Sequence, residues 1–404
     1  MIKELYRIET VETSLNVTQG FVDSIRRKHI VKSGCRVYEG GCIGIAGTLG
    51  EASHATWAQA VSNLERKVPY PYAPAQNQVR KEDRREEILD SRTFTARTEQ
   101  LLERLRAAFP RIIFSNKVNM TQQTVTLTND AGLDYHSRDL VYSVVLLAKD
   151  VDSAAVFDSA AQYVGRTFDV DMIFEDASQV MAAHTKAVPL PEVKTLPLII
   201  ETNLVTDPLA QALNGQLFHR NASLLSGKTG QQLFSPAVSL YVDRTAENLG
   251  ETFFDAEGSV LPGDQCALIE NGVLLRPYAD KKTAADFGAD NTASAGGNYN
   301  DLPQLSVPGM RFSSSGKDLK ELLQGRDAAF VVMASGGDCT PEGMLATPVQ
   351  TSYLYRDGKL LGKLPEFSAR GSLFDLLGKN YLGYSQDKPF NGVKCLAIEA
   401  EITK

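Results

Sequence analysis

The first part of the chain switches between two hydrophobic periodicities. Apolar and polar residues alternate through "LYRIETVETSLNVTQGFVDSIRRKHI", with a turn signal at Gln19–Gly20, and a second hairpin is indicated around Glu39–Gly41. Near residue 53 the apolar spacing becomes helical in "SHATWAQAVSNLERKV", where Ser53 or Thr56 can cap the helix. This region is therefore predicted to be strands followed by one helix.

The next hundred residues add helices and long strands. "ARTEQLLERLRAAFP" predicts an amphipathic helix ended by Pro110, and strands follow on both sides of the turn "NDAG". Helical patterns follow at 153–165 and 171–186, and the charged run 79–91 is interpreted as a solvated helical face or loop. "AVPLPEVKTLP", with three prolines, indicates a domain boundary near residue 190.

The second half is rich in strands, with hairpin turns at "ENG" and "RDG". The small and polar segment 281–305 is predicted to be a long loop. The expected fold is α+β: an N-terminal α/β domain over residues 1–190 with a mostly antiparallel sheet, and a C-terminal β-rich, barrel-like domain over residues 191–404.

Composition and charge exclude several function classes. With 42 basic and 49 acidic residues, the chain has a formal charge of −7, which disfavours binding to nucleic acid. No apolar run is long enough to span a membrane, and "MIKELYRIET" carries charges where a secretion signal needs apolar residues. The five cysteines are scattered, which is typical of free thiols in a reducing compartment, so we expect a cytoplasmic protein without a membrane anchor.

Local motifs for catalysis or nucleotide binding are incomplete. "SGKT" ends like a phosphate-binding loop, but Ala222 stands where that loop needs its first glycine, which favours a surface turn. A zinc site commonly has two histidines one helical turn apart, whereas this chain's histidines form no local pair. They are His29, His54, His136, His184 and His219. No sequence cue indicates a Ser-His-Asp or Cys-His site.

Several longer stretches together resemble the TldD/PmbA family, the "modulator of DNA gyrase" proteins, over nearly the whole chain. "ETSLNVTQGFVDSIRRKHIVKSGCRVYEGGCIGIAGT" resembles the family's opening strands, and "VTLTNDAGLDYHSRDLVYSVVLLAKD" resembles its next hairpin. "SGKTGQQLFSPAVSLYVDRT" resembles the segment before a central strand. The most specific likeness is "FFDAEGSVLPGDQCALIENGVLLRPYADKKTAADFG", with its D-x-E-G and "LIENGVL".

The resemblance implies a degenerate metal site. In the TldD-like branch a helix carries H-E-x-x-x-H, two zinc ligands and a general-base glutamate, and a later cysteine completes the site. An ungapped alignment on "SGKTG" puts Thr206 and Gln211 at the histidine positions and Asp207 at the glutamate position. Threonine and a neutral amide are poor zinc ligands. The chain therefore resembles the PmbA-like, or TldE-like, branch, and Asp207 near a helix start is expected to have a structural role.

The resemblance implies a non-catalytic subunit that has no cofactor of its own. Its partner would be a cytoplasmic TldD-like zinc peptidase, the pair would process unfolded peptides, and zinc is expected only in the partner. The alternative is a stand-alone homodimer that binds peptides or acts as a scaffold. A third hypothesis is acid–base chemistry by Asp338 and Glu342 in "SGGDCTPEG". With these two, His219 and Asn298 complete the candidate cleft residues.

Overall fold

The computed structural model describes all 404 residues. An eight-stranded sheet forms the N-terminal part, in the order β4-β3-β2-β1-β6-β7-β5 with β8 paired to β7. All of its pairings are antiparallel except that of β5 with β7. The strands are β1 (Ile2–Thr18), β2 (Phe21–Glu39), β3 (Cys42–Leu49), β4 (Val68–Pro69), β5 (Gln78–Asp83), β6 (Ile112–Asn129), β7 (Leu133–Asp150) and β8 (Ser159–Gly165). The mostly antiparallel N-terminal sheet is confirmed.

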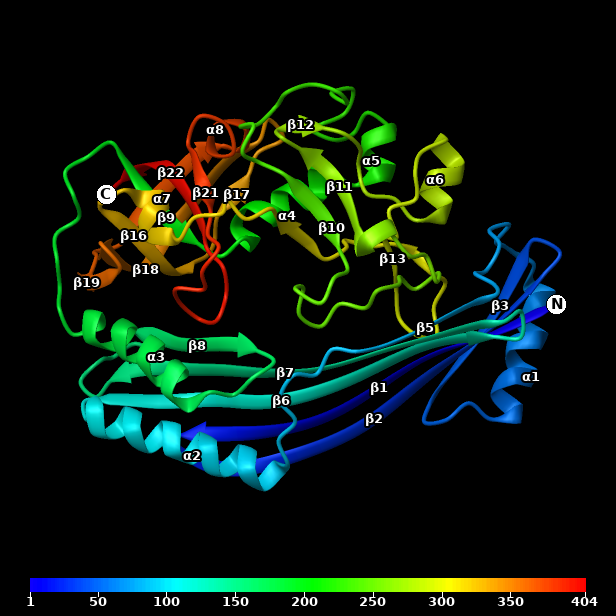
Figure 1. Cartoon of the computed structure of the whole chain (residues 1–404), viewed down its shortest axis with the longest axis horizontal. Helices are drawn as coiled ribbons and strands as arrows, with labels where there is room; N and C mark the ends of the chain where they lie inside the picture. The colour runs from blue at the N-terminus through cyan, green and yellow to red at the C-terminus, as the bar shows by residue number, and fades with distance from the viewer.

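Local turn chemistry sets both predicted hairpins. Gln19 and Gly20 have φ values of 52° and 77°, and Gly40 and Gly41 have φ values of 59° and 75°. Positive φ at two successive residues suits the tight turns whose twist matches that of paired strands. The first turn joins β1 to β2 and the second joins β2 to β3. The long strands β1, β2, β6 and β7 run across the lower part of Figure 1.

Three helices belong to this part: α1 (His54–Asn63), α2 (Ser91–Ala108) and α3 (Val170–His184), with a short 3-10 turn at Leu64–Arg66. Ser53 caps α1, as predicted, by accepting a hydrogen bond from the backbone N–H of Thr56. The carboxylate of Asp90 caps α2, whose apolar stripe is buried among the sheet's core residues. Figure 1 shows α2 and α3 near one end of the long strands and α1 near the other.

Two sequence interpretations were wrong in this part. The segment 153–165 contains β8 instead of a helix, because its backbone pairs with β7 and this tertiary pairing outweighs the local helical spacing. The charged run 79–91, interpreted as a solvated helical face or loop, is a loop only over residues 84–90; residues 79–83 belong to β5, which pairs in parallel with β7. Mixed charges are compatible with a strand here because Arg80 of β5 and Arg84 just after it bind groups in the C-terminal half.

A closed five-stranded barrel forms the C-terminal part, which confirms the barrel-like prediction. β16 pairs with β9, β9 with β22, β22 with β20, β20 with β18, and β18 returns to β16. β17, β19 and β21 pair with single barrel strands. The barrel and attached strands are β9 (Thr195–Ile200), β16 (Ala328–Ala334), β17 (Asp338–Cys339), β18 (Met344–Arg356), β19 (Lys359–Lys363), β20 (Phe367–Ser372), β21 (Tyr381–Tyr384) and β22 (Leu396–Thr403).

Short strands and helices complete the C-terminal part. A four-stranded sheet consists of β12, β11, β10 and β15, and β13 pairs with β14. These strands are β10 (Leu240–Asp243), β11 (Gln265–Glu270), β12 (Val273–Leu274), β13 (Ala295–Gly296), β14 (Gln304–Leu305) and β15 (Met310–Phe312). The helices are α4 (Asn203–Ala212), α5 (Gly215–His219), α6 (Lys281–Phe287), α7 (Leu319–Leu323) and α8 (Leu373–Leu376), with a 3-10 turn at Pro262–Asp264.

The segment 281–305 is not the continuous loop predicted from its small, polar composition. It contains α6, β13 and β14. The carboxylate of Asp280 accepts a hydrogen bond from the backbone N–H of Thr283 and caps α6. Gly288, at φ 64°, ends the helix in the left-handed conformation.

One hydrophobic cluster joins the two parts of the chain. It combines Leu15 and Val170 with the barrel residues Ile199, Phe330 and Tyr353. The eight-stranded sheet nevertheless takes its strands only from residues 2–165, and the barrel takes its strands from residue 195 onward. A division into domains at residue 190 stays a prediction.

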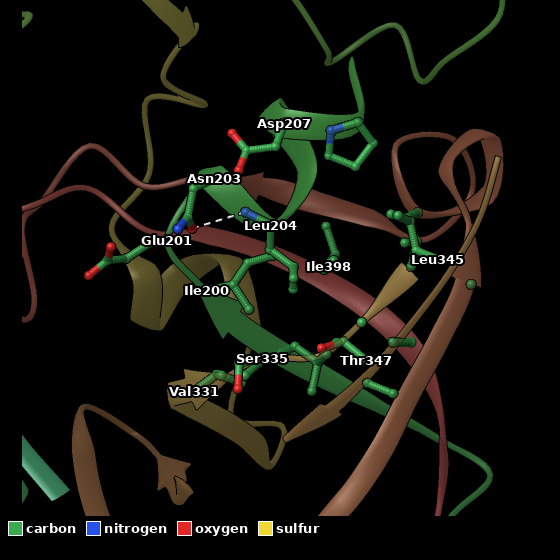
Figure 2. Close-up of a pocket in the computed structure, with 18 of the residues that line it drawn as sticks. Ile200, Glu201, Asn203, Leu204, Asp207, Val331, Ser335, Leu345, Thr347 and Ile398 are labelled. Carbon is green, nitrogen blue, oxygen red and sulfur yellow. Dashed lines mark hydrogen bonds between the residues drawn. The ribbon is translucent and has the colours of Figure 1, made fainter. Parts of the chain in front are cut away.

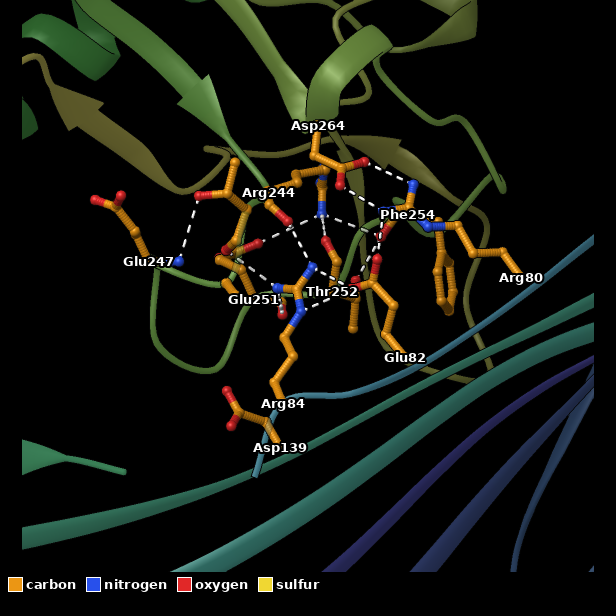
Figure 3. A network of polar contacts seen from close by, with 12 residues as sticks. Arg80, Glu82, Arg84, Asp139, Arg244, Glu247, Glu251, Thr252, Phe254 and Asp264 are labelled. Carbon is orange, nitrogen blue, oxygen red and sulfur yellow. Dashed lines mark hydrogen bonds and ion pairs between the residues drawn. The ribbon is translucent and has the colours of Figure 1, made fainter. Parts of the chain in front are cut away.

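Two arginines, Arg80 in β5 and the buried Arg84 just after it, connect the sheet to the C-terminal part (Figure 3). The Arg84 guanidinium donates hydrogen bonds to the backbone oxygens of Arg244 at 2.7 Å, Thr245 at 3.1 Å and Glu251 at 2.8 Å. Its side chain is only 4% exposed. Because buried backbone oxygens need a hydrogen-bond donor, Arg84 satisfies the carbonyl groups of this loop and fixes it against the sheet. The ion pair of Arg80 with Asp264 adds a second link.

The D-x-E-G segment makes a second contact between the two parts. Glu257 is buried, and its carboxylate accepts hydrogen bonds from the Tyr70 hydroxyl at 2.6 Å and the Lys281 backbone N–H at 2.9 Å. Burial, with a smaller contribution from the Asp255 carboxylate, raises the pKa of Glu257 to about 7. The folded chain therefore keeps a proton at Glu257 at pH values where an unfolded chain has lost it.

This raised pKa predicts a pH-dependent stability. Between about pH 4.5 and 7 the folded state binds more protons at Glu257 than the unfolded state, so this contribution is full below pH 4.5 and is lost as pH rises through 7. We expect the free energy of unfolding of the wild type, relative to Glu257→Gln, to fall by up to about 1 kcal/mol per pH unit between pH 5.5 and 7. Urea unfolding of both proteins measures this difference, and parallel pH profiles would contradict it.

Candidate functional site at the mouth of the barrel

A cavity of about 630 Å³ opens at one end of the barrel. Many of the residues that line it alternate along a strand, because successive side chains of a strand point to opposite faces and one face is the barrel interior. They include Leu198 and Ile200 of β9, Leu345 and Thr347 of β18, Ala369 and Gly371 of β20, and Ile398 and Ala400 of β22. The small residues among them leave this end of the barrel open.

Helix α4 borders the cavity with a polar face. Asn203, Asp207 and Gln211 all line the cavity, and their spacing of four residues places them on one side of the helix. Figure 2 shows Asn203 and Asp207 on α4 near Ile200 and Ile398. The Asn203 side-chain oxygen accepts a hydrogen bond from the Leu204 backbone N–H at 2.9 Å. The mouth therefore combines an apolar interior with polar groups along one edge.

The rim carries unneutralised negative charge. Glu201 and Asp207 are exposed cavity residues, and neither forms an ion pair. The carboxylate of Glu201 accepts only a long hydrogen bond, 3.4 Å, from the Asn391 amide. Arg370, which also lines the cavity, is neutralised by Glu401 at 2.8 Å. A ligand at the mouth would therefore meet two unpaired carboxylates, whereas the one cation of the lining is already paired with Glu401.

The donor groups at the mouth do not fit a zinc ion. Of the three degenerate motif positions, Asp207 and Gln211 line the cavity, whereas Thr206 does not. The structure contains no group of three His, Cys, Asp or Glu side chains arranged to hold a metal. Zinc sites use at least three such donors, and an amide is a poor substitute. The three motif positions together therefore supply a single good donor, the carboxylate of Asp207.

Asp207 lies further into its helix than expected. It is the fifth residue of α4, past the first turn, where the effect of the helix dipole has largely faded. The structural role expected for it at a helix start therefore has no support in this geometry, and its carboxylate faces the cavity instead.

The remaining sequence candidates are dispersed. His219 lies outside the cavity lining and stacks on Phe287, with ring centroids 5.0 Å apart. Asn298 donates to the Asp301 carboxylate at 2.8 Å in the loop after β13, also away from the cavity. Asp338 and Glu342 are exposed and do not line the cavity, although Gly337 and Cys339 do.

The "SGKT" stretch forms turns, as expected, and Lys228 donates to the Leu224 backbone oxygen at 2.8 Å. Its ammonium is thus engaged within its own loop. Sequence reasoning missed Glu201, Ser335, Arg370 and the inward-facing small residues. They come from segments far apart in the chain: Glu201 and Ser335 follow directly after β9 and β16, and Arg370 lies in β20. The period-two alternation of the strands could have indicated only the inward-facing small residues.

No helix in the structure combines the length and apolar character that crossing a membrane requires.

Comparisons with known proteins agree with this architecture. Residues 196–396 match the family model described as "PmbA/TldA metallopeptidase C-terminal domain". An uncharacterized protein of Methanocaldococcus jannaschii is 26% identical over 260 residues, which are 62% of this chain and 59% of that protein. A metalloprotease of Methanothermobacter thermautotrophicus is 25% identical over 197 residues, 46% of this chain and 43% of that protein. The chain thus spans about half the length of the curated relatives it matches.

Two solved structures share the fold over the whole chain. TldE from Thermococcus kodakarensis superposes with a TM-score of 0.79 at 17% identity, covering 100% of this chain and 96% of that one. A putative modulator of DNA gyrase from Thermotoga maritima gives a TM-score of 0.76 at 19% identity, covering 99% and 95%. The matched C-terminal domain and the named metalloprotease relatives make the chain a member of the metallopeptidase-related PmbA/TldD family, and the shared fold agrees with this.

Proposed function

We propose that this chain is a metal-free, TldE-like subunit that pairs with a TldD-like zinc peptidase and holds part of an unfolded peptide at the mouth of its barrel. The observation that carries the proposal is the cavity: it has the size and mixed lining of a ligand site, yet its donors cannot hold zinc. The chain would bind and position peptide, and the partner would supply the catalytic metal.

The strand layout supports peptide binding at this place. β17 is the end strand of its sheet and pairs only with β18, and its residue Cys339 borders the cavity. An extended peptide can add to such a free edge through backbone hydrogen bonds while one of its side chains enters the cavity. A zinc-bound hydroxide stabilises a hydrolytic transition state by several kcal/mol, and no group at this mouth replaces it.

The proposal predicts that peptide hydrolysis requires a partner. The full chain is mixed with an unfolded peptide substrate, alone and together with a TldD-like paralogue, and cleavage is followed by mass spectrometry. We expect no cleavage by this chain alone, cleavage in the mixture, and its loss when the paralogue's motif histidines are changed. Zinc analysis of the separated chains should find the metal only in the paralogue.

The controls separate this role from its rivals. Cleavage by the isolated chain that persists in a chelator and is lost in Asp338→Ala or Glu342→Ala would replace the proposal with carboxylate chemistry. A stable homodimer that binds peptide but neither pairs with the paralogue nor supports cleavage would establish the scaffold alternative instead.

A further inference from the structure

We infer that the barrel mouth selects peptide segments in which a bulky apolar side chain stands next to a cationic residue; this selectivity rests on the proposed function and specifies its substrate class. The apolar side chain would enter the open end of the barrel. The cationic group would lie at the rim, near the carboxylates of Glu201 and Asp207.

The apolar part follows from the lining of the cavity. Leu198, Ile200 and Ile398 are each almost fully buried and form the inner wall. Ala369 and Ala400 have small side chains, and they leave empty the space that larger side chains would fill if the interior of the barrel were fully packed. A leucine or phenylalanine side chain moved from water into this space gains roughly 1.5–3 kcal/mol when fully buried, whereas a serine gains nothing comparable.

The cationic part follows from the charges at the rim. Asp207 has neither an ion-pair nor a hydrogen-bond partner, and Glu201 has only the long contact from Asn391. The single cation of the lining, Arg370, is already paired with Glu401. A cationic peptide residue would therefore be attracted, and an acidic one repelled, with a dependence on ionic strength typical of exposed charges.

Calorimetric titration of the full chain at low salt tests this selectivity. The probes are three blocked hexapeptides of alanine whose central pair is lysine–leucine, glutamate–leucine or lysine–serine. The lysine–leucine peptide should bind about tenfold more tightly than either of the others. In Asp207→Lys, the preference for lysine over glutamate should shrink to about twofold or less.

Two further variants keep the test specific. Glu65→Lys makes the same charge change at an exposed glutamate that makes no ion pair and does not line the cavity, and it should keep the tenfold preference. Ala334→Trp places a large side chain at the half-buried edge of the mouth and should weaken lysine–leucine binding about tenfold, with an unchanged circular dichroism spectrum.

The outcomes distinguish the inference from the function on which it rests. Equal binding of the three peptides, or a preference unchanged in Asp207→Lys, would overturn the inference even if cleavage in the mixture needs this chain. The expected preference in a chain that never pairs with a TldD-like paralogue would support the selectivity of the mouth and refute the subunit role.

Discussion

Arg84→Ala is expected to lower the free energy of unfolding by about 3–5 kcal/mol, the range typical of removing one partner from a buried ionic network. The guanidinium binds three backbone oxygens of the 244–251 segment and pairs with Glu82 at 2.7 Å. Alanine would leave the backbone oxygens of Arg244 and Glu251 without a donor at the contact between sheet and loop, whereas Thr245 would keep only the Asn248 backbone N–H at 3.2 Å. Urea unfolding followed by circular dichroism measures the loss.

Arg111→Ala is the matched control for this change. Its guanidinium is 63% exposed and pairs with the surface carboxylates Asp150 and Asp152. Exposed pairs of this kind contribute about 0–1 kcal/mol, so the control should lose little. Similar losses in the two variants would show that the burial of Arg84 has no special role.

Gly34→Ala is expected to destabilise the protein by about 2–3 kcal/mol, although alanine normally stabilises a strand relative to glycine. A Cβ atom at Gly34 would lie 1.8 Å from the backbone oxygen of Tyr299, on a loop that comes from the C-terminal half. A backbone oxygen cannot move aside as the end of a flexible side chain can. The loop that contains Tyr299 must therefore shift away from β2 to make room for the added methyl group. Thermal and urea unfolding measure the stability of the variant.

A second glycine and a neighbouring threonine test this explanation. A Cβ atom at Gly47 would lie 2.3 Å from Asn300 of the same loop, so Gly47→Ala should also be destabilising. Thr48→Ala, which removes a hydroxyl bonded only to the next backbone oxygen, should change the free energy of unfolding by less than about 1 kcal/mol. A Gly34→Ala protein as stable as Thr48→Ala would contradict this explanation, because it would show that the loop at Tyr299 packs equally well when residue 34 carries a Cβ atom.

Local signals predicted the parts of the fold that depend on neighbours in sequence. The turns at Gln19–Gly20 and Gly40–Gly41 and the cap at Ser53 are each set by a few adjacent residues. The closure of the barrel is different, because β9 and β16 pair in parallel through residues 198–199 and 329–330, far apart in the chain. No local pattern encodes a pairing of that separation.

The same limit applies to the candidate site. Asp207 and Gln211 were found because the family resemblance marks their helix, and both face the cavity. Glu201 and Arg370 were missed, since their shared position at the mouth follows only from the register of the barrel strands. The sequence interpretation missed β5 because a run of mixed charges is typical of a solvent-exposed segment. Arg84, just after β5, is instead buried and donates a hydrogen bond to the backbone oxygen of Arg244, 160 residues later in the chain.

The hydrophobic cluster that joins the two parts has a consequence for synthesis of the protein. It contains Leu15 from the first strand together with Cys395, just before β22, and Ala397, near the start of that strand. While the ribosome is still making the C-terminal half, the apolar face of the N-terminal sheet that later packs against the barrel is exposed to solvent. The nascent chain must keep this surface from aggregating until β22 emerges, so chaperone demand and sensitivity to premature termination should extend to that strand.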